Sequence, residues 1–351
     1  MNIKGFMAAF AAGVLLCIGA QAQEKRFAVT EFSVNYMRLN PDYESPLETQ
    51  ELMGTVVEIV SEQGYWKEIV SPQPYKAWAT DMGMVEMNAE GIKEYLASPR
   101  YICTALTGRV LEEPKDNARQ VCDFVAGDIV RAVTKASAAG KAEDELSKKD
   151  YAVVKGWAEV VLPSGKHGFI RSKDVQPLGE WCRMCNPTVD NLLETARQFV
   201  GIPYLWGGMS PKGFDCSGLV RYVWFLNGVL LPRNASQQIH CGERIAMDAD
   251  FDRSDREEML KRTENLRAGD LVFFGKPATE GNKERVTHVG IYLGNHHIIH
   301  SSHLVRINSL LPGDPDHYSN SFKLIGACRI TSDNTTGTVK IADSPAYFVK
   351  E

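Results

Sequence analysis

The stretch FDCSGLV, residues 214–220, decides how the rest of this chain is interpreted. It places Cys216 between an acid and a serine, at the point where a helical pattern begins. The residues that follow, CSGLVRYVWFLNG (216–228), carry apolar side chains at helical spacing, and Gly228 ends the pattern. Backbone N–H groups at a helix N-terminus stabilise negative charge. The position therefore indicates a reactive thiolate, the form in which cysteine acts as a nucleophile.

Length and charge narrow the class of protein. A chain of 351 residues is too long for one ordinary domain and predicts two or three. The net charge of −5 does not indicate the basic surface that nucleic-acid binding requires. Beyond the N-terminus the chain has no run of 18 apolar residues, so we expect no stable membrane span. We expect a monomer.

The N-terminus, MNIKGFMAAFAAGVLLCIGAQAQEKR, has a lysine, a short apolar stretch and the small residues AQA. This pattern predicts a secretory signal peptide over residues 1–22, with cleavage after Ala22. A membrane anchor is the alternative. The residues VLLC, which end at Cys17, resemble a lipidation site, although Leu16 is bulky where a small residue is expected. The mature protein is thus predicted to be exported to the periplasm or cell envelope.

The mature chain would keep an odd number of cysteines, so at least one thiol is free or pairs with another chain. These are Cys103, Cys122, Cys182, Cys185, Cys216, Cys241 and Cys328. Cys182 and Cys185 form a lone C-x-x-C, for which a local disulfide, two buried thiols or a zinc site are the options. Without a second pair or a nearby histidine, we expect no metal, and no organic cofactor either.

The N-terminal half reads as short strands separated by turn residues. Residues 27–92 have this character, and residues 101–178 repeat it. Strands of this length and spacing predict two small antiparallel barrels, over residues 23–95 and 96–182.

The C-terminal half has a different order. Thr188 is expected to cap a helix that Gly201 ends, a Gly/Pro-rich loop follows, and the helix at Cys216 comes next. Residues 241–266 read as a surface helix and loop, and strands are expected at 269–275, 287–295, 296–302 and 324–330. This order predicts an α+β domain over residues 186–330, followed by a tail, 331–351, without a strong signal. A cysteine that opens a helix packed on strands carrying histidines is the papain-like arrangement.

Two histidines are candidates to activate Cys216. His288 shares one face of its strand with Gly290 and Tyr292. His300 follows on the next strand, where pairing of adjacent strands can bring it beside His288. We therefore expect His288 to act as the base and His300 to orient it. The histidines at 296 and 297 are competitors nearer the turn, whereas those at 240 and 303 have no supporting context.

An oxyanion donor is also required by this chemistry. The backbone N–H of Cys216 and a residue of the loop 204–208 are the candidates.

Several linked motifs carry a family resemblance over roughly residues 190–330. They are PYLWGG, FDCSGLV, LPRNASQQ, AGDLVFF, THVGIYLG and IIHSS, in this order. Together they resemble the NlpC-type cysteine peptidases, a papain-like group that cuts bacterial cell-wall peptides. The resemblance implies that Cys216 is the nucleophile, His288 the general base and His300 the orienting third residue. It also implies cleavage after γ-D-glutamate.

The two barrels resemble bacterial SH3-like domains. The order of two SH3-like barrels and an NlpC-type domain is similar to that of the γ-D-glutamyl-L-diamino acid dipeptidyl-peptidases. In that family the barrel beside the active site closes one end of the cleft, and an acidic cluster binds the free amine of L-Ala. The resemblance thus implies an all-β N-terminal region, two small SH3-like barrels, followed by an α+β papain-like catalytic domain.

The same resemblance suggests residues that bind substrate. Asp215 matches the amine-binding aspartate, and capping of the helix is its alternative or additional role. Tyr204 and Trp206 would form the walls of the cleft. The remaining candidates are Ser217 and Arg233 for the D-Glu portion, with Ser236 as a neighbour, and Glu48 and Tyr75 for the rest of the amine pocket. Glu48 departs from the family pattern, in which the acid stands beside the serine.

The sequence therefore predicts a secreted cysteine peptidase whose partner is a murein peptide substrate. It would release L-Ala-γ-D-Glu by cutting before L-Lys or diaminopimelate. An endopeptidase that acts on intact cell wall, a non-catalytic wall-binding protein and an acyltransferase on the same fold are the alternatives.

Overall fold

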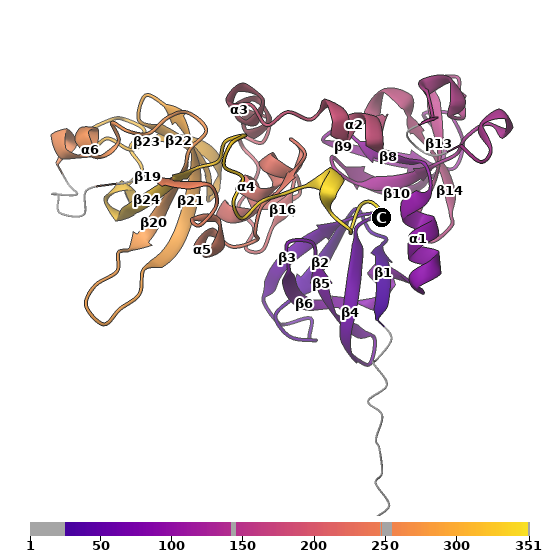
Figure 1. Ribbon diagram of the computed structural model, residues 1–351, viewed down its shortest axis with the longest axis horizontal. Coiled ribbons are helices and arrows are strands. Elements are labelled where there is room, and N and C mark those ends of the chain that lie inside the picture. Colours follow the sequence, from indigo (N-terminus) through magenta and orange to yellow (C-terminus); the bar gives the residue numbers. More distant parts are fainter. Residues whose placement is uncertain (1–24, 142–144, 246, 248–254, 350–351) are drawn as a thin grey trace, which may run out of the picture.

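The computed structural model describes residues 25–141, 145–245, 247 and 255–349. The expected signal peptide and Cys17 lie outside the described residues. Figure 1 shows the first two β-rich units next to each other and the C-terminal α+β unit beside them. Within the described ranges, no helix has the length and hydropathy needed to cross a membrane.

The first unit is a strongly bent antiparallel sheet in the order β3-β2-β6-β5-β4-β1-β7. Its residues alternate as a half-buried strand requires: Val57 and Ile59 are buried in the core, whereas Glu58 between them is partly exposed. Helix α1, Ala89–Ala97, follows and begins at Asn88, whose side chain accepts a hydrogen bond from the backbone N–H of Gly91. The strands are β1 Arg26–Thr30, β2 Val34–Arg38, β3 Leu47–Leu52, β4 Val56–Gln63, β5 Trp66–Ser71, β6 Tyr75–Thr80 and β7 Met84–Met87.

The second unit repeats this design in the order β10-β9-β14-β13-β11-β8-β15, with β12 paired to β13. Helix α2, Leu178–Met184, leads out of it. The strands are β8 Arg100–Cys103, β9 Thr107–Leu111, β10 Gln120–Val125, β11 Ile129–Ala132, β12 Val153–Val154, β13 Trp157–Val161, β14 His167–Arg171 and β15 Val175–Pro177.

The third unit packs helices on a mixed-length antiparallel sheet in the order β19-β24-β20-β21-β22-β23. The helices are α3 Val189–Arg197, α4 Cys216–Phe225, α5 Ala235–Gln238 and α6 Arg256–Arg262. The strands of the sheet are β19 Glu243–Ile245, β20 Leu271–Lys276, β21 Arg285–Gly294, β22 His297–Ser302, β23 Leu304–Ser309 and β24 Leu324–Arg329. Two short hairpin-like pairs accompany them, β16 Met209–Ser210 with β17 Gly213–Phe214, and β18 Val229–Leu230 with β25 Val339–Lys340.

Most expected elements of this unit are confirmed. Thr188 caps α3, because its hydroxyl accepts a hydrogen bond from the backbone N–H of Asn191. The structure adds β19 and β23, which the sequence pattern did not predict. The turn before β23 uses His303 at a φ of +64°, a left-handed conformation without the glycine or proline that usually signals a turn.

Helix α4 is the centre of the molecule. Leu219, Val220 and Val223 are fully buried, and the hydrophobic cluster around them includes residues from both barrels. At Gly127 an added Cβ would meet the ring of Phe225 at 2.6 Å, so the second barrel approaches α4 closely there. The three units therefore share one continuous core, which fixes their relative positions.

The C-terminal segment, for which the sequence offered no assignment, joins all three units. It runs from the third unit back to the two barrels, as the yellow ribbon in Figure 1 shows. Its strand β25 pairs with β18, and the backbone carbonyl of Ala346 accepts a hydrogen bond from Val56 of the first barrel. Tyr347 is buried against Phe225 of α4, and the ring of Phe348 lies 5.3 Å from the guanidinium of Arg100.

We predict that Tyr347→Ala lowers the midpoint of thermal unfolding and costs roughly 3 kcal/mol, because it removes a buried aromatic ring from the shared core. Val349→Ala, at a side chain that is 41% exposed two residues later, should change stability by less than about 0.5 kcal/mol. Differential scanning calorimetry of both variants measures the contrast. Equal midpoints for the two variants would show that this segment does not hold the units together.

Candidate active site

Cys216 is the first residue of α4, as the sequence predicts. Asp215 is the N-cap, and its carboxylate accepts a hydrogen bond of 2.7 Å from the backbone N–H of Gly218. A Cβ at Gly218 would lie 2.0 Å from the carbonyl oxygen of Gly208. Only glycine therefore allows the loop 204–208 to approach the start of the helix and to lie beside the thiol.

The surroundings of the Cys216 thiol act on its pKa in opposite directions. Burial, with a smaller contribution from the Asp215 carboxylate, raises the pKa to about 12. The backbone N–H of Val289 on β21 opposes this shift, as does that of Ser217 at the helix N-terminus. Burial has the larger effect, so the expected net decrease is not found. The thiol is neutral until a base removes its proton.

Two histidines and an asparagine form a hydrogen-bonded chain. The Nε2 atom of His288 lies 2.7 Å from Nδ1 of His300, and Nε2 of His300 lies 3.0 Å from Oδ1 of Asn308. The Nδ2 group of Asn308 donates to the backbone carbonyl of Asp316, which fixes the orientation of the amide. Gly290 makes room for the chain, because a Cβ there would lie 3.1 Å from Cβ of His300.

This chain defines which ring nitrogens carry protons. The Oδ1 atom of Asn308 can only accept, so Nε2 of His300 must donate to it. In a neutral His300 the Nδ1 atom is then an acceptor, and Nε2 of His288 donates to it. The remaining nitrogen, Nδ1 of His288, is left without a proton. Asn308 thus prepares His288 to accept a proton, a function that the sequence analysis did not assign.

Burial also keeps both histidines neutral. Burial lowers the pKa of His288 to about 3, together with smaller contributions from the neighbouring His300 and the Arg306 guanidinium. The pKa of His300 falls to about 4 for the same reason, although the hydrogen bond to Asn308 opposes the shift. Tyr318 packs edge-on against His300, with ring centroids 4.6 Å apart, and helps to exclude water.

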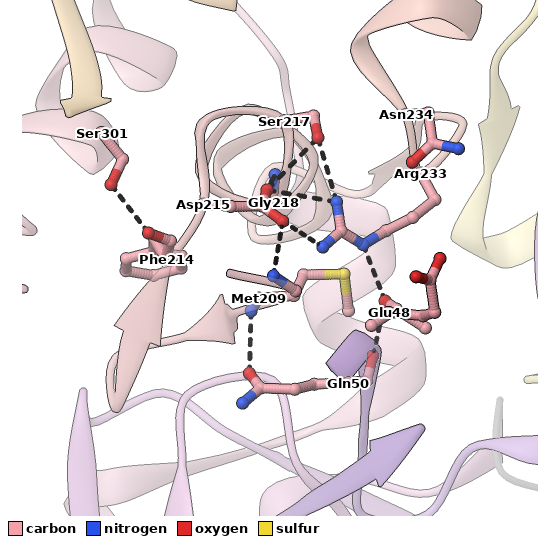
Figure 2. Close-up of polar contacts among 12 residues, drawn as sticks. Glu48, Gln50, Met209, Phe214, Asp215, Ser217, Gly218, Arg233, Asn234 and Ser301 are labelled. Carbon is pink, nitrogen blue, oxygen red and sulfur yellow. Dashed lines mark hydrogen bonds and ion pairs between the residues drawn. The ribbon is translucent and has the colours of Figure 1, made fainter. Parts of the chain in front are cut away.

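The carboxylate of Asp215 is the most heavily bonded group of the site (Figure 2). Arg233, which is 2% exposed, donates from Nη2 to Oδ2 at 2.5 Å and from Nη1 to Oδ1 at 3.2 Å. The backbone N–H of Gly207 and the hydroxyl of Ser217 also donate to this carboxylate. Asp215 therefore caps the helix and forms a buried ion pair at the same time.

Arg233 is less available to substrate than the sequence suggests. Besides its bonds to Asp215, it donates from Nη1 to the hydroxyl of Ser217 at 3.0 Å and from Nε to the hydroxyl of Thr49 at 2.7 Å. A guanidinium has five N–H groups, and four are used here. The two N–H groups of Arg233 that were expected to bind a carboxylate of the substrate thus bind Asp215 instead.

The first barrel contributes two residues to the site. The hydroxyl of Tyr75 on β6 donates a hydrogen bond of 2.5 Å to the carboxylate of Glu48 on β3. Figure 2 shows Glu48 beside Arg233 and Asn234. Burial and the Glu48 carboxylate raise the pKa of Tyr75 to about 12. Within the described residues Glu48 forms no ion pair, so its carboxylate can still bind a cation.

Of the remaining candidates, Tyr204 and Trp206 belong to the loop before the thiol, whereas Ser236 lies away from the site. Burial raises the pKa of Tyr204, and its phenol lies close enough to Cys216 and Asp215 for their charges to raise it further. Trp206, in the same loop, is 65% exposed. Ser236 is exposed on α5 and is not brought to the cluster by any contact of the described chain, whereas Asn234 contacts Tyr75.

The other described cysteines were candidates for a disulfide or a metal site. None of the seven described cysteines forms a disulfide, including the Cys182–Cys185 pair. Over the ranges that the structure covers, no three His, Cys, Asp or Glu side chains are grouped to hold a metal ion.

This arrangement of a helix-capped cysteine and a buried histidine pair on an antiparallel sheet defines a papain-like cysteine peptidase. Comparison with known proteins agrees with this class. Residues 201–318 match the NlpC/P60 family model. A γ-D-glutamyl-L-lysine dipeptidyl-peptidase of Bacillus cereus is 28% identical over 288 residues, which cover 79% of this chain and 73% of the relative.

A second relative and one solved structure also extend over most of the chain. Dipeptidyl-peptidase 6 of Lysinibacillus sphaericus is 27% identical over 77% of this chain and 86% of its own length. The crystal structure of an NlpC/P60 family protein from Bacillus cereus has a TM-score of 0.65 at 20% identity and covers 86% of this chain and 99% of that chain. The chain is thus a cysteine peptidase with an NlpC/P60 domain, and the expected fold class, barrels followed by a papain-like domain, is confirmed.

We predict that Asp215→Ala destabilises the protein by about 3–5 kcal/mol, because it leaves the buried guanidinium of Arg233 without its partner. Asp255→Ala is the matched control. Asp255 also caps a helix, α6, but is exposed and without this ion pair, so its loss should cost only about 1 kcal/mol. Urea denaturation of both variants compares them. Similar losses would mean that capping, and not the ion pair, accounts for the effect of Asp215.

We predict that Asn308→Leu slows alkylation of Cys216 by iodoacetamide on the order of tenfold, because His300 loses the acceptor that sets the protonation pattern of both rings. Asn308→Asp keeps an acceptor oxygen and should restore most of the rate. Peptide mapping by mass spectrometry separates Cys216 from the other thiols. Unchanged alkylation in Asn308→Leu would show that the proton arrangement does not depend on Asn308.

Proposed function

We propose that this cysteine peptidase hydrolyses the bond between γ-D-Glu and an L-diamino acid in murein peptides with a free N-terminal L-Ala. The products are L-Ala-γ-D-Glu and the peptide that begins with the diamino acid. The observation that carries the proposal is the position of Glu48 and Tyr75. They bring an unpaired carboxylate from the first barrel to the Asp215–Arg233 cluster, next to the nucleophile. The names of the two dipeptidyl-peptidase relatives support the same reaction.

The chemistry follows from the hydrogen-bonded chain. Cys216 attacks the γ-carbonyl carbon of D-Glu while Nδ1 of His288 takes the thiol proton. His288 then gives this proton to the leaving amine, which breaks the C–N bond and leaves a thioester on Cys216. A water molecule, deprotonated by His288, attacks the thioester and releases the dipeptide acid and the thiol. His300 and Asn308 hold the imidazole in orientation throughout.

The developing oxyanion needs two donors. The backbone N–H of Cys216 is one. In the loop 204–208 the backbone N–H groups of Tyr204, Leu205, Gly207 and Gly208 already donate to protein acceptors. The hydroxyl of Tyr204, whose pKa responds to the nearby Cys216, is the proposed second donor, and the backbone N–H of Trp206 is its competitor in this loop.

The amine of L-Ala is proposed to bind mainly to Glu48. A buried ammonium requires a carboxylate partner, and the lone pairs of Asp215 are largely used by its own donors. Asp215 contributes its negative charge and holds Arg233 in position. Ser217 and the remaining N–H of Arg233 are proposed to face the D-Glu portion, with Trp206 at the solvent side. An intact cell-wall stem would have to extend beyond L-Ala into the space that Glu48 and Tyr75 occupy, which disfavours an endopeptidase.

We also propose that the predicted signal peptide, residues 1–22, exports the protein to the cell envelope. This location would place the peptidase where murein fragments are released. Residues 23–95 and 96–182 are proposed as the two SH3-like barrels and residues 186–330 as the catalytic domain, with the segment 331–351 as a separate element.

The decisive experiment uses the chain from residue 23 and two peptides, L-Ala-γ-D-Glu-L-Lys and the same peptide with an acetylated amine. Mass spectrometry identifies the products, and Cys216→Ala is the inactive control. We expect cleavage of the free-amine peptide alone. In addition, Glu48→Gln should lower kcat/KM for this peptide roughly tenfold to a hundredfold, because a charged hydrogen bond is lost.

Glu44→Gln, an exposed residue in the loop before β3, is the matched control and should behave as the unmodified enzyme. Equal cleavage of both peptides would contradict the amine-binding role and favour an endopeptidase. No cleavage of either peptide would refute the proposed bond.

A further inference from the structure

Arg306 lies beside the histidine chain on β23. In the register of β22 and β23 it stands directly opposite His300. Directly opposed residues of an antiparallel pair project to the same face, with Cβ atoms about 4.5–5.5 Å apart. The side chain of Arg306 therefore extends next to His300, on the face that also carries Asn308 two residues later.

Arg306 differs from the four arginines of this unit that ion pairs hold. It is half-buried, and its Nε atom is fully buried without a hydrogen-bond partner. No ion pair joins it to any acid of the described chain. By contrast, ion pairs to carboxylates hold Arg233, Arg244, Arg256 and Arg329. A half-buried guanidinium without an anion is energetically unfavourable, so Arg306 is available to an anion from outside the chain.

Arg306 and Arg233 lie at different ends of the site. Arg306 stands opposite His300 on β23, whereas Arg233 is bonded to Asp215 and Ser217 at the start of α4. The charge of Arg306 accordingly lowers the pKa of His288 and His300. In the proposed reaction the acyl half of the substrate lies on the side of Arg233 and Glu48. The leaving amine must lie next to His288, which gives it a proton. Arg306 is thus on the side of the leaving residue.

We propose that Arg306 is a specificity-determining residue that binds a carboxylate of the amino acid on the leaving side of the cleaved bond. This inference rests on the proposed function and names its substrate class further: a diamino acid with a free carboxylate. Guanidinium matches carboxylate with two parallel hydrogen bonds, which gives geometric selectivity as well as affinity. The carboxylate has two possible sources, the α-carboxylate of any C-terminal diamino acid and the distal carboxylate of diaminopimelate.

Four tripeptides distinguish the sources. They are L-Ala-γ-D-Glu-L-Lys, its C-terminal amide, the diaminopimelate tripeptide, and the diaminopimelate tripeptide with an amidated distal carboxylate. Values of kcat/KM are measured for the unmodified enzyme, Arg306→Gln and Arg197→Gln. Arg197 is exposed on α3 and controls for the loss of one positive charge.

We expect Arg306→Gln to lower kcat/KM roughly tenfold to a hundredfold for peptides that carry the bound carboxylate. Their amides should change less than about threefold, and Arg197→Gln should leave all four values unchanged. If kcat/KM falls for L-Ala-γ-D-Glu-L-Lys and for both diaminopimelate peptides, but not for the C-terminal amide of the lysine peptide, the α-carboxylate is the bound group. Loss confined to the free-acid diaminopimelate peptide assigns the distal carboxylate. The amides also report whether the variant is correctly folded.

Two outcomes overturn the inference while the proposed function stands. One is an equal loss for acids and amides, which would mean that Arg306 supports the histidines structurally. The other is no loss for any peptide. If the unmodified enzyme cleaves none of the four peptides, the proposed function fails and this inference fails with it.

Discussion

The buried carboxylate of Asp215 is the contact on which the rest of the site depends. It binds the start of α4 through Gly218, the preceding loop through Gly207, and the segment before α5 through Arg233. Arg233 in turn reaches Thr49, so the same ion pair ties the first barrel to the catalytic unit. A charge pair excluded from water is costly unless its hydrogen-bonding groups are satisfied. Here the hydrogen-bonding groups of the pair are satisfied by four segments: the start of α4, the loop of Gly207, the segment of Arg233 and the first barrel through Thr49. None of the four can shift without breaking a bond to a buried charge.

The dry environment that strengthens these bonds also restrains the nucleophile. Burial raises the pKa of Cys216 and lowers that of His288. An isolated thiolate and an isolated imidazolium are therefore both disfavoured. In the proposed reaction, proton transfer from Cys216 to His288 conserves the total charge and creates two opposite charges, which attract strongly where water is excluded. The proposed reactivity thus depends on a histidine that accepts the proton rather than on a thiol that ionises alone. The chain from His288 through His300 to Asn308 holds that histidine in orientation.

The peptidase domain is only part of the machinery. The NlpC/P60 family model covers residues 201–318, yet Glu48 and Tyr75 reach the site from the first barrel, and Tyr347 packs on α4 from beyond the match. The shared core explains how such remote segments can be placed accurately. Because α4 packs against both barrels as well as its own sheet, the position of the barrel is set by the helix that carries Cys216. The proposed amine pocket is built across units and needs this rigidity, since a small displacement would separate Glu48 from the Asp215–Arg233 cluster.

The sequence by itself determined the order of the units, the helix that starts at Cys216, and the strands of His288 and His300. Local signals are sufficient for these features: an acid at an N-cap, apolar residues at helical or alternating spacing, and glycines at the turns. It also indicated Glu48 and Tyr75, although only through a resemblance. Tertiary structure alone decided that Arg233 is bound to Asp215, that Asn308 ends the histidine chain, that Arg306 stands opposite His300, and that the C-terminal segment joins the units. Each of these depends on strand register or on contact between distant segments, and neither leaves a local periodic signal in the chain. The strand β23, which carries both Asn308 and Arg306, was missed because its turn lacks glycine and proline.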